Sequence, residues 1–421
     1  MSRSLDVYLF SKLAGRLDLD QSRNITFVYA GDWLDCSAGI PLSQSLPLRK
    51  APFGHEDCRG YFAGLLPSGD ARTRAATNMG VGPRNDLVLL DKLGGECTGA
   101  VSFLPSGSVP DQNKAIYRRM SSQQLARILN LLPQRPLLAG EEGIRHTLPG
   151  HRPKAPVHKV NSQITMPFGG SPSTHIIKPA DVMHADYAAN ELLCLRIAAI
   201  LGVPVVAAEE GKAEEISYLL TERYDRRILN VDGAGTSSLV RLHQEDFCQA
   251  LGCAPDRSSQ SLGGPSLRNC FDLVRCVSSS PAIDLISLLD AVILNFLIGN
   301  TEADGRSYSL LYGNGDHDRN YVRLAPFYGI RSGLYYAETS PRHAMKIGNQ
   351  YLSSKVTAKD FEILAAEAGL NASLVKSRLK LIVEKTISAL PDAGEAVVGS
   401  KHVAAFIDNR CRQARSQLTD G

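Results

Sequence analysis

A stretch of ten residues, 300–309, combines side chains that could carry out chemistry. Its sequence, NTEADGRSYS, holds carboxylates at Glu302 and Asp304, a guanidinium at Arg306 and a hydroxyl at Ser307. A strongly apolar helical pattern precedes the stretch, and an alternating hairpin pattern follows it. A loop in this position, with acids and a cation, could be the active-site loop of a phosphotransferase.

Phosphoryl transfer needs a backbone cradle for phosphates, a cation to neutralise them, metal ligands and a carboxylate that orients the hydroxyl. The turn TLPGHRPK, residues 147–154, could be the cradle, because its glycine allows close backbone approach and Arg152 and Lys154 add charge. Lys178 ends a predicted strand, where a phosphate-neutralising lysine would lie. The stretch TERYDR, 221–226, would be the hinge between two lobes, with its backbone facing an adenine.

Each feature also has a structural explanation. A turn rich in Pro and Gly is more often only a turn, and a lone strand lysine is usually solvated. Residues 221–226 could equally be an edge strand that runs into a charged turn. We expect His151 and His158 to be structural or to face an anion, because the ten histidines form no H-E-x-x-H pattern. The SLVK at 373–376 fits S-x-x-K, but it lacks companion motifs.

The bulk properties indicate an ordinary globular protein. The 421 residues suffice for two or three domains, with 43% hydrophobic and 21% charged residues. A net charge of +3 does not by itself indicate binding to nucleic acid or to a membrane surface. The longest apolar run, 291–299, is too short to span a bilayer, and the first ten residues hold no secretory signal. Nine cysteines without a C-x-x-C pair indicate reduced thiols, so we expect a soluble cytoplasmic protein.

The first half of the chain is predicted to be rich in strands. Strands are expected at 5–10, 25–29, 203–210 and 216–226, and another ends at Lys178. Two helices and a closing strand are expected between 60 and 105, with a helix stop at Gly94 and Gly95. The remaining predictions are a linker at 106–115, helices at 121–132 and 186–201, and two β-like runs around the turn within 144–160.

The second half is predicted to be almost wholly helical from residue 243, broken only by one hairpin. That hairpin joins SYSLLY to YVRLAPFY through the turn-rich GNGDHDRN. Final helices are expected at 358–368, 371–389 and 393–417, with Thr357 and Asp360 at capping-box spacing at the start of the first. This order is typical of an α+β, two-lobed protein-kinase-like fold with a β-rich N-terminal lobe and a mostly helical C-terminal lobe.

A series of motifs resembles the HipA family, the serine/threonine kinases of bacterial toxin–antitoxin modules. The motifs occur in order along essentially the whole chain: LLPSGDARTR at 65, GGECTGAVSFLP at 94, TLPGHRPK at 147, HIIK at 175, NELLCLRIAAILGV at 190, ERYDR at 222, RLHQEDFCQALG at 241, LIGNTEADGRSYSLLY at 297 and LAPFYGI at 324. Each motif alone is weak evidence, whereas the ordered series is strong.

The resemblance implies a domain plan, cofactors and a partner. The plan is an N-terminal subdomain at 1–105, a linker and helix at 106–140, a nucleotide-cradling part at 141–225, and a helical C-lobe at 226–421 with its catalytic-loop region at 297–330. The cofactors would be ATP and Mg²⁺. The partner would be a small helix-turn-helix antitoxin of HipB type, with DNA reached only through it and no membrane contact. The protein substrate stays open.

The resemblance also assigns an ATP site. Its residues would be Pro149, Gly150, His151, Arg152, Pro153, Lys154, Lys178, Glu222, Arg223, Tyr224, Asp304, Gly305, Arg306, Ser307, Tyr328 and Gly329. Six basic side chains near the C-terminus could face an antitoxin complex or its DNA, although a solvated helical face is the simpler explanation. They are Lys376, Arg378, Lys380, Arg410, Arg412 and Arg415.

The catalytic loop departs from the family pattern T-D-x-H-x-K-N. The base position holds Glu302 in place of Asp, the His position holds Asp304, and the Lys position holds Arg306. The metal-binding Asn is replaced by Ser307, and the second metal-binding Asp, after the hairpin, by Gly329. In the phosphate loop, the pair His151–Arg152 stands in place of Ala-Gln.

These departures predict that turnover is very weak or absent. A carboxylate moved by one methylene is misplaced by about 1 Å, which can cost roughly 10²-fold in rate. Ser307 is a weaker magnesium ligand than an amide carbonyl, and Gly329 supplies no ligand. Asp304 could act as a displaced ligand. The alternative function is that of a pseudokinase, a non-catalytic binding protein that sequesters an antitoxin or another partner.

Overall fold

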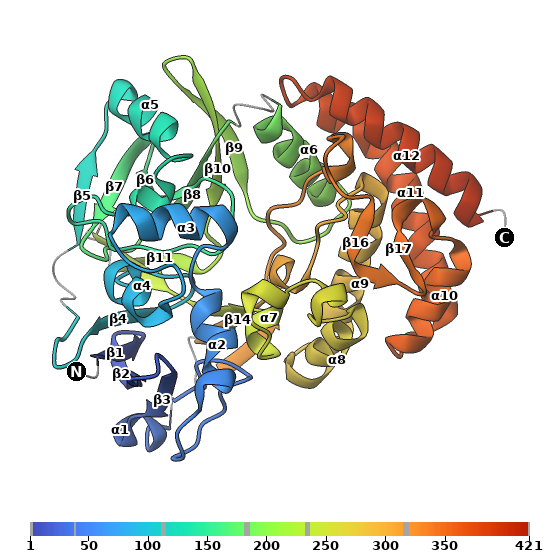
Figure 1. Ribbon diagram of the computed structural model, residues 1–421. Coiled ribbons are helices and arrows are strands. Elements are labelled where there is room, and N and C mark those ends of the chain that lie inside the picture. The colour runs from blue at the N-terminus through green and yellow to red at the C-terminus, as the bar shows by residue number, and fades with distance from the viewer. Residues whose placement is uncertain are drawn as a thin grey trace. The chain divides into compact units, whose positions relative to one another are not determined.

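The computed structural model describes residues 3–37, 39–110, 115–180, 186–231, 236–314 and 320–419. The chain divides into two compact units. Unit 1 comprises Met1–Pro179, Gly211–Asp256 and Leu311–Asn320, and unit 2 comprises Ala180–Glu210, Arg257–Leu310 and Tyr321–Gly421. Helices and sheets are both present, in agreement with the α+β prediction (Figure 1).

Unit 1 begins with a four-stranded antiparallel sheet of order β3-β2-β1-β4. Its strands are β1 (Arg3–Leu9), β2 (Lys12–Leu19), β3 (Ile25–Tyr29) and β4 (Val101–Pro105). The strands predicted at 5–10 and 25–29 are confirmed as β1 and β3, but β2 was missed. Phe10 and Ser11 form the turn between β1 and β2 with φ of 51° and 64°. Because such turns usually use Asn or Gly, this pair gives no turn signal.

Four helices lie in the chain between β3 and β4, and the first, second and fourth of them pack with this sheet. They are α1 (Gly31–Leu34), α2 (His55–Gly64), α3 (Gly69–Asn78) and α4 (Asp86–Leu93). Three of them fall where two helices were predicted, because Pro67 and Ser68 separate α2 from α3. The predicted stop at Gly94 is confirmed, since its N–H donates to the Leu90 carbonyl at 2.7 Å and caps α4.

The second sheet of unit 1 has six strands in the order β5-β7-β6-β8-β10-β9. The strands are β5 (Ile116–Arg119), β6 (Ala155–Val160), β7 (Gln163–Phe168), β8 (His175–Pro179), β9 (Ala208–Ala213) and β10 (Ile216–Glu222). Since β10 lies between β8 and β9, the edge-strand part of the alternative explanation for residues 221–226 is wrong, but the charged turn is present at residues 223–225. The β-like run predicted before the turn at 147–154 is also not a strand, and His146 makes only an isolated bridge with Glu96. Within the predicted linker, residues 111–114 lie outside the described residues.

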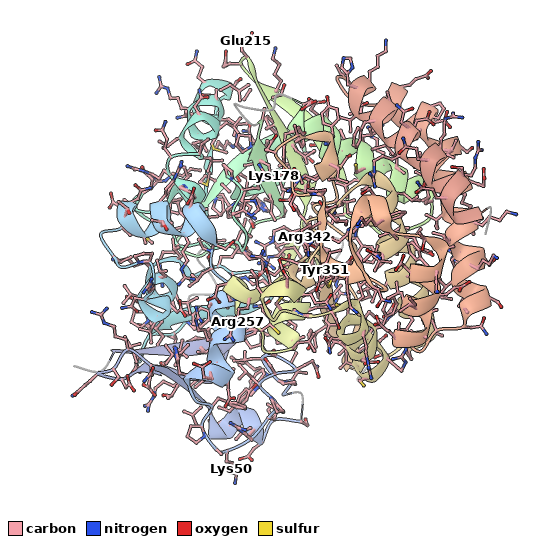
Figure 2. All side chains as sticks on the ribbon, turned by 45° about the vertical axis from the view of Figure 1, so that its right-hand side comes forward. Lys50, Lys178, Glu215, Arg257, Arg342 and Tyr351 are labelled. Atoms are coloured by element: carbon pink, nitrogen blue, oxygen red, sulfur yellow. The ribbon has the colours of Figure 1, made fainter. Side chains whose placement is uncertain are left out.

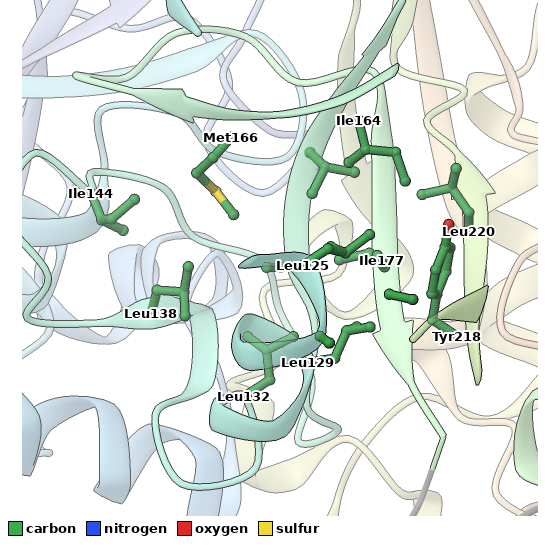
Figure 3. Packing of buried hydrophobic residues seen from close by; sticks show 14 residues of the cluster. Leu125, Leu129, Leu132, Leu138, Ile144, Ile164, Met166, Ile177, Tyr218 and Leu220 are labelled. Carbon is green, nitrogen blue, oxygen red and sulfur yellow. The ribbon is translucent and has the colours of Figure 1, made fainter. Parts of the chain in front are cut away.

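The core of this sheet is built against α5 (Ser122–Leu131), which confirms the helix predicted at 121–132. The Ser121 side chain accepts from the Gln124 N–H and the Gln124 side chain accepts from the Ser121 N–H, a capping box that fixes where α5 begins. Leu125 and Leu129 on α5, with Leu132 just after it, belong to one buried cluster with Ile177 and Tyr218 of the sheet (Figure 3). This cluster holds β8, the strand that carries Lys178.

Unit 1 is completed by three further strands and a short helix. They are β11 (Arg226–Val231), β12 (Thr236–Arg241), β13 (His243–Asp246) and α7 (Phe247–Ala250). Strands β11 and β12 form an antiparallel ribbon. Residues 311–314 of β14 (Ser309–Asn314) also belong to this unit.

Unit 2 is mostly helical. Its helices are α6 (Tyr187–Ile200), α8 (Leu267–Val277), α9 (Pro281–Ile298), α10 (Ala358–Glu367), α11 (Ala372–Glu395) and α12 (Lys401–Thr419). Among the described residues, α9 is the single helix long and apolar enough to cross a membrane, with a mean hydropathy of 1.9. However, 67% of it is buried, and it packs against α6, α8, α11 and α12. We therefore assign α9 as the core helix of this unit.

The predictions for the second half are confirmed in part. The hairpin strands are present as β14 and β15 (Asn320–Leu324), although residues 315–319 of its turn lie outside the described residues. A second hairpin, β16 (Arg342–Ile347) with β17 (Gln350–Leu352), and strand β13 were missed, so the prediction of a single hairpin is wrong. The capping box of Thr357 and Asp360 is confirmed at α10. Helix α11 runs through Pro391 to Glu395, beyond the predicted end at 389.

Candidate active site

The end of α9 positions the predicted catalytic loop. Gly299 ends the helix with φ of 76°, a left-handed conformation that glycine adopts readily, and the Asn300 N–H donates to the Asn295 carbonyl at 2.8 Å. Arg410 of α12 donates to two further carbonyls near this helix end, those of Leu297 at 3.2 Å and Phe296 at 2.9 Å. The C-terminal carbonyls of a helix otherwise lack partners, so these bonds hold the start of the loop.

Two of the basic side chains near the C-terminus therefore have structural roles. Arg410 binds the end of α9, and Arg378 of α11 forms an ion pair with Asp290 of α9. The solvated-face explanation is wrong for these two residues. Arg412 pairs with Asp408 at 2.7 Å on the surface of α12 and fits that explanation better.

Both carboxylates of the loop are paired with arginines inside unit 2. Glu302, at the predicted base position, forms an ion pair with Arg331. Asp304 accepts from the Arg306 N–H at 2.9 Å and from the Arg306 Nε and Nη2 at 3.2 and 2.9 Å. The Asp304 side chain is only 7% exposed, whereas that of Glu302 is 44% exposed. The two acids and two arginines sum to zero charge.

The remaining positions of the loop are held by hydrogen bonds and a tight turn. Residues Gly305–Ser307 form one turn of 3-10 helix, in which the Ser307 Oγ accepts from the Asp304 N–H at 3.3 Å. The Tyr328 hydroxyl donates to the Arg306 carbonyl at 2.9 Å. Gly329 follows with φ of 63°, and apart from the two neighbouring residues of the chain no residue has an atom within 4 Å of the place where its Cβ would be.

The donors and acceptors in this loop do not fit a magnesium site. Magnesium is usually held by one or two carboxylates together with substrate phosphates. Here Glu302 and Asp304 are neutralised by arginines, Gly329 has no side chain, and the Ser307 Oγ accepts a backbone N–H. The described part of the chain also holds no group of three or more His, Cys, Asp or Glu suited to a metal ion. The prediction that Asp304 acts as a displaced ligand stays without structural support.

The predicted phosphate loop is fixed to the front region of unit 1. Gly150 has φ of 96°, and its carbonyl accepts from the Ser68 N–H at 3.1 Å. A Cβ at Gly150 would lie 2.9 Å from the Lys154 Nζ, so the glycine allows that ammonium to approach the backbone. Thr147, which begins the turn, is buried, and its Oγ1 donates to the Leu65 carbonyl at 2.9 Å.

Lys178 lies on β8 in the middle of the six-stranded sheet, as the strand prediction requires (Figure 2). It is opposite Leu219 of β10 in the antiparallel register and is half-buried. Strand β8 ends one residue later than predicted, at Pro179. Lys178 and the hinge strand β10 are therefore neighbours in one sheet.

The predicted hinge is anchored by a buried ion network that sequence reasoning missed. Arg223 uses all its N–H donors, on Asp225 twice, on Glu96, on the Ser173 hydroxyl and on the Cys97 carbonyl, at 2.8–3.2 Å. Arg226 adds a bond to Glu96 at 2.9 Å. The side chain of Arg223 therefore belongs to this network and has no donor left for a nucleotide.

The arginines of the network keep its acids ionised although the side chains are buried away from water. Glu96 and the two arginine side chains are at most 1% exposed. Burial alone would raise the pKa of Glu96, but Arg223, Arg226 and Arg241 outweigh it and lower the pKa to about 2. Since Glu96 lies in the N-terminal part of the chain, this network ties that part to the predicted hinge. The two other hinge residues differ, as Glu222 is exposed and Tyr224 donates to Gln244 at 2.6 Å.

The arrangement is that of a protein-kinase-like α+β protein. A β-rich unit carries the glycine turn, the strand lysine and the hinge segment, and a helical unit carries the loop that follows its core helix. The HipA N-terminal domain family matches residues 5–104, and the HipA-like C-terminal domain family matches residues 146–393. The chain therefore belongs to the HipA family, as the motif series indicated.

Individual relatives agree with this assignment. The chain is 37% identical over 424 residues to Y4mE of Sinorhizobium fredii, covering 98% of each chain. It is 23% identical over 402 residues to the serine/threonine-protein kinase toxin HipA of Shewanella oneidensis, covering 92% of this chain and 89% of that protein. The solved structure of Shewanella oneidensis HipA with HipB and its operator DNA matches the fold with a TM-score of 0.83, at 22% identity, over 99% of this chain and 98% of that one.

Proposed function

We propose that this chain is a HipA-type serine/threonine kinase homologue in which phosphotransfer from ATP to protein Ser or Thr is weak or lost. The observation that supports the proposal is the pairing of both loop carboxylates with arginines, Glu302 with Arg331 and Asp304 with Arg306. A positioned base contributes on the order of 10²–10⁴-fold to rate. A carboxylate that is held by a guanidinium cannot orient a substrate hydroxyl without first giving up that partner.

The two pairs differ in strength. The Glu302–Arg331 pair is half-exposed on the acid side, so screening limits it to about 1 kcal/mol or less. Asp304 is nearly buried and accepts three bonds from Arg306, of which those from the charged guanidinium are worth about 1.5–3 kcal/mol each. Asp304 is thus the less available of the two acids. Glu302 is the remaining candidate base, with a side chain one methylene longer than the family's Asp.

The proposal keeps a nucleotide-binding role for unit 1. Gly150 and Lys154 in the phosphate loop, Lys178 on β8 and the anchored hinge would give weak ATP binding that depends little on Mg²⁺. The loop cannot supply the usual metal ligands, so the metal would contribute little to affinity. A nucleotide site that is kept while the metal ligands are missing is the combination expected of a pseudokinase.

The proposed partner is a small helix-turn-helix antitoxin of HipB type, with DNA contacted only through it. Support comes from the relative in Shewanella oneidensis, whose HipA was solved with HipB and operator DNA. A cytoplasmic location is proposed with it, since such a complex acts on DNA. If the chain does not transfer phosphate, sequestering the antitoxin would be its remaining function.

Calorimetric titration with ATP, with and without magnesium, tests the nucleotide-binding part of the proposal. We expect weak binding that changes little when magnesium is added. Lys178→Ala should weaken it about tenfold or more, because a charged hydrogen bond is worth about 1.5–3 kcal/mol. The matched control is Lys212→Ala, an exposed lysine paired with Glu215, which should leave binding unchanged. Tight binding that requires magnesium would contradict the proposal.

A further inference from the structure

Arg331 lies two residues after Gly329, the position where the family has its second metal-binding Asp. Its side chain is 12% exposed and forms the ion pair with Glu302. We infer that the Arg331 guanidinium supplies the positive charge that a divalent ion would otherwise supply in this loop, and that it prevents a metal ion from binding there. This inference rests on the proposed function and deepens it, because it names the residue that determines which cation the loop holds.

The position of Arg331 is fixed by residues of α6. Its guanidinium carbon lies 5.2 Å from the centre of the Tyr187 ring, a cation–π contact. The next residue is held by Asn190, whose amide donates to the Ser332 carbonyl at 3.0 Å and accepts from the Ser332 N–H at 2.8 Å. Asn190 is fully buried, and it also donates to the Tyr336 hydroxyl at 3.2 Å. Arg331 is therefore held in place by its surroundings, whereas its partner Glu302 is half-exposed.

The groups around Arg331 also favour its charged form. Burial lowers the pKa of Arg331, but Tyr187, Glu302 and the buried Glu191 outweigh it and raise the pKa above its ordinary value. The guanidinium therefore stays charged at every accessible pH. A divalent ion that entered beside Glu302 would meet this positive charge, and repulsion between two cations at close range is strong where solvent is partly excluded.

The space at Gly329 makes the inference testable. A Cβ there would touch nothing, and φ of 63° is a conformation that Asp and Asn tolerate better than most residues. A Cβ can thus be added at Gly329 without a clash. With the Arg331 guanidinium still beside Glu302, we expect repulsion to keep a divalent ion out, so that Gly329→Asp alone does not create a metal site.

The experiment measures binding of Mn²⁺ alone, without nucleotide, by electron paramagnetic resonance of the free ion. The proteins are the unmodified chain, Gly329→Asp, Arg331→Met, and the double variant that combines the two changes. We expect the double variant to bind one Mn²⁺ about tenfold or more tightly than either single variant, because the two changes act on one site and are non-additive. Arg412→Met is the matched control, since it frees the carboxylate of Asp408 outside the loop and should gain no site.

Three results would overturn the inference. They are stoichiometric Mn²⁺ binding by the unmodified chain that is lost in Glu302→Gln, binding by Gly329→Asp alone that equals the double variant, and a folded double variant that gains no site. Circular dichroism and a thermal melt show whether each variant is folded. Because the assay contains neither ATP nor a protein substrate, its failure is distinguishable from failure of the proposed function.

Discussion

Replacing Glu96 with Gln should destabilise unit 1 severely, because it removes one of two acids from a buried network that contains two arginines. In the native chain Glu96 is fully buried and accepts from Arg223, Arg226 and both the N–H and the hydroxyl of Ser173. After the change, Asp225 alone would face both guanidiniums. Breaking a buried pair on one side costs about 3–5 kcal/mol, and the pKa supports that size.

The pKa of Glu96 gives an independent magnitude and a pH window. It falls from an ordinary value of 4.5 to about 2, which corresponds to about 3 kcal/mol of stability. A lowered pKa means that this stability is present above pH 4.5 and is lost as the pH falls from 4.5 towards 2. The difference between the native chain and Glu96→Gln should therefore be constant near neutral pH and shrink below pH 4.5.

Urea unfolding followed by tryptophan fluorescence and circular dichroism measures both effects. The native chain and Glu96→Gln are compared at pH 7 and at steps below pH 5. Glu141→Gln is the matched control, because its pair with Arg135 is exposed and should contribute at most about 1 kcal/mol. Two results would refute this account of the network. One is a free energy of unfolding for Glu96→Gln within about 1 kcal/mol of the native chain. The other is a difference between the two free energies that stays the same as the pH falls below 4.5.

Other predictions concern a second buried acid, the hinge and the cell. Burial raises the pKa of Glu245 to about 7 despite hydrogen bonds from Ser43 and Tyr312, so the folded state favours its neutral form and loses stability as the pH rises from 4.5 through 7. Glu245→Gln should therefore raise the melting temperature more at pH 8 than at pH 5, and an equal change at both would contradict this. Arg223→Lys should lower stability at pH 7 by several kcal/mol in a urea titration, because an ammonium cannot replace the guanidinium's bonds to several acceptors; a variant as stable as the native chain would count against the network. Overproduction in a bacterial host should leave the growth rate unchanged, whereas an arrest that disappears in Lys178→Ala would mean that the site turns over.

Local patterns were enough to predict much of the fold. Helices α5, α6 and α10 carry apolar spacing and stop or cap signals near their ends, and their positions were predicted within one or two residues. The missed elements lack such signals. Strand β2 follows a turn made of Phe10 and Ser11, and β16 and β17 are joined by the short turn at Gly348, where φ is 54°. A turn whose conformation is imposed by the surrounding sheet cannot be recognised from its residue types.

In the candidate site, too, local sequence patterns predict positions but not the contacts between distant residues. The position of the loop at 300–309 and the substitutions in it follow from the sequence. Its pairing does not, because Arg331 is 29 residues from Glu302, and Arg223 is 127 residues from Glu96. Such pairs are made by the packing of distant elements, and no local pattern reports them. The substitutions in the loop are therefore readable in the sequence, whereas the pairing that supports the proposal comes only from the structure.

The most direct test of the central claim is transfer of radiolabelled phosphate from ATP by the unmodified chain. The assay uses the full chain with magnesium, a generic serine substrate and the chain itself as acceptors, and Lys178→Ala as the inactive control. A variant with Glu302→Asp, Ser307→Asn and Gly329→Asp is measured both with Arg331 and with Arg331→Met. We predict transfer near the Lys178→Ala background for the unmodified chain, and the largest gain when all four positions are changed. Transfer by the unmodified chain that equals or exceeds that of the four-position variant, and that is abolished by Lys178→Ala, would contradict the account.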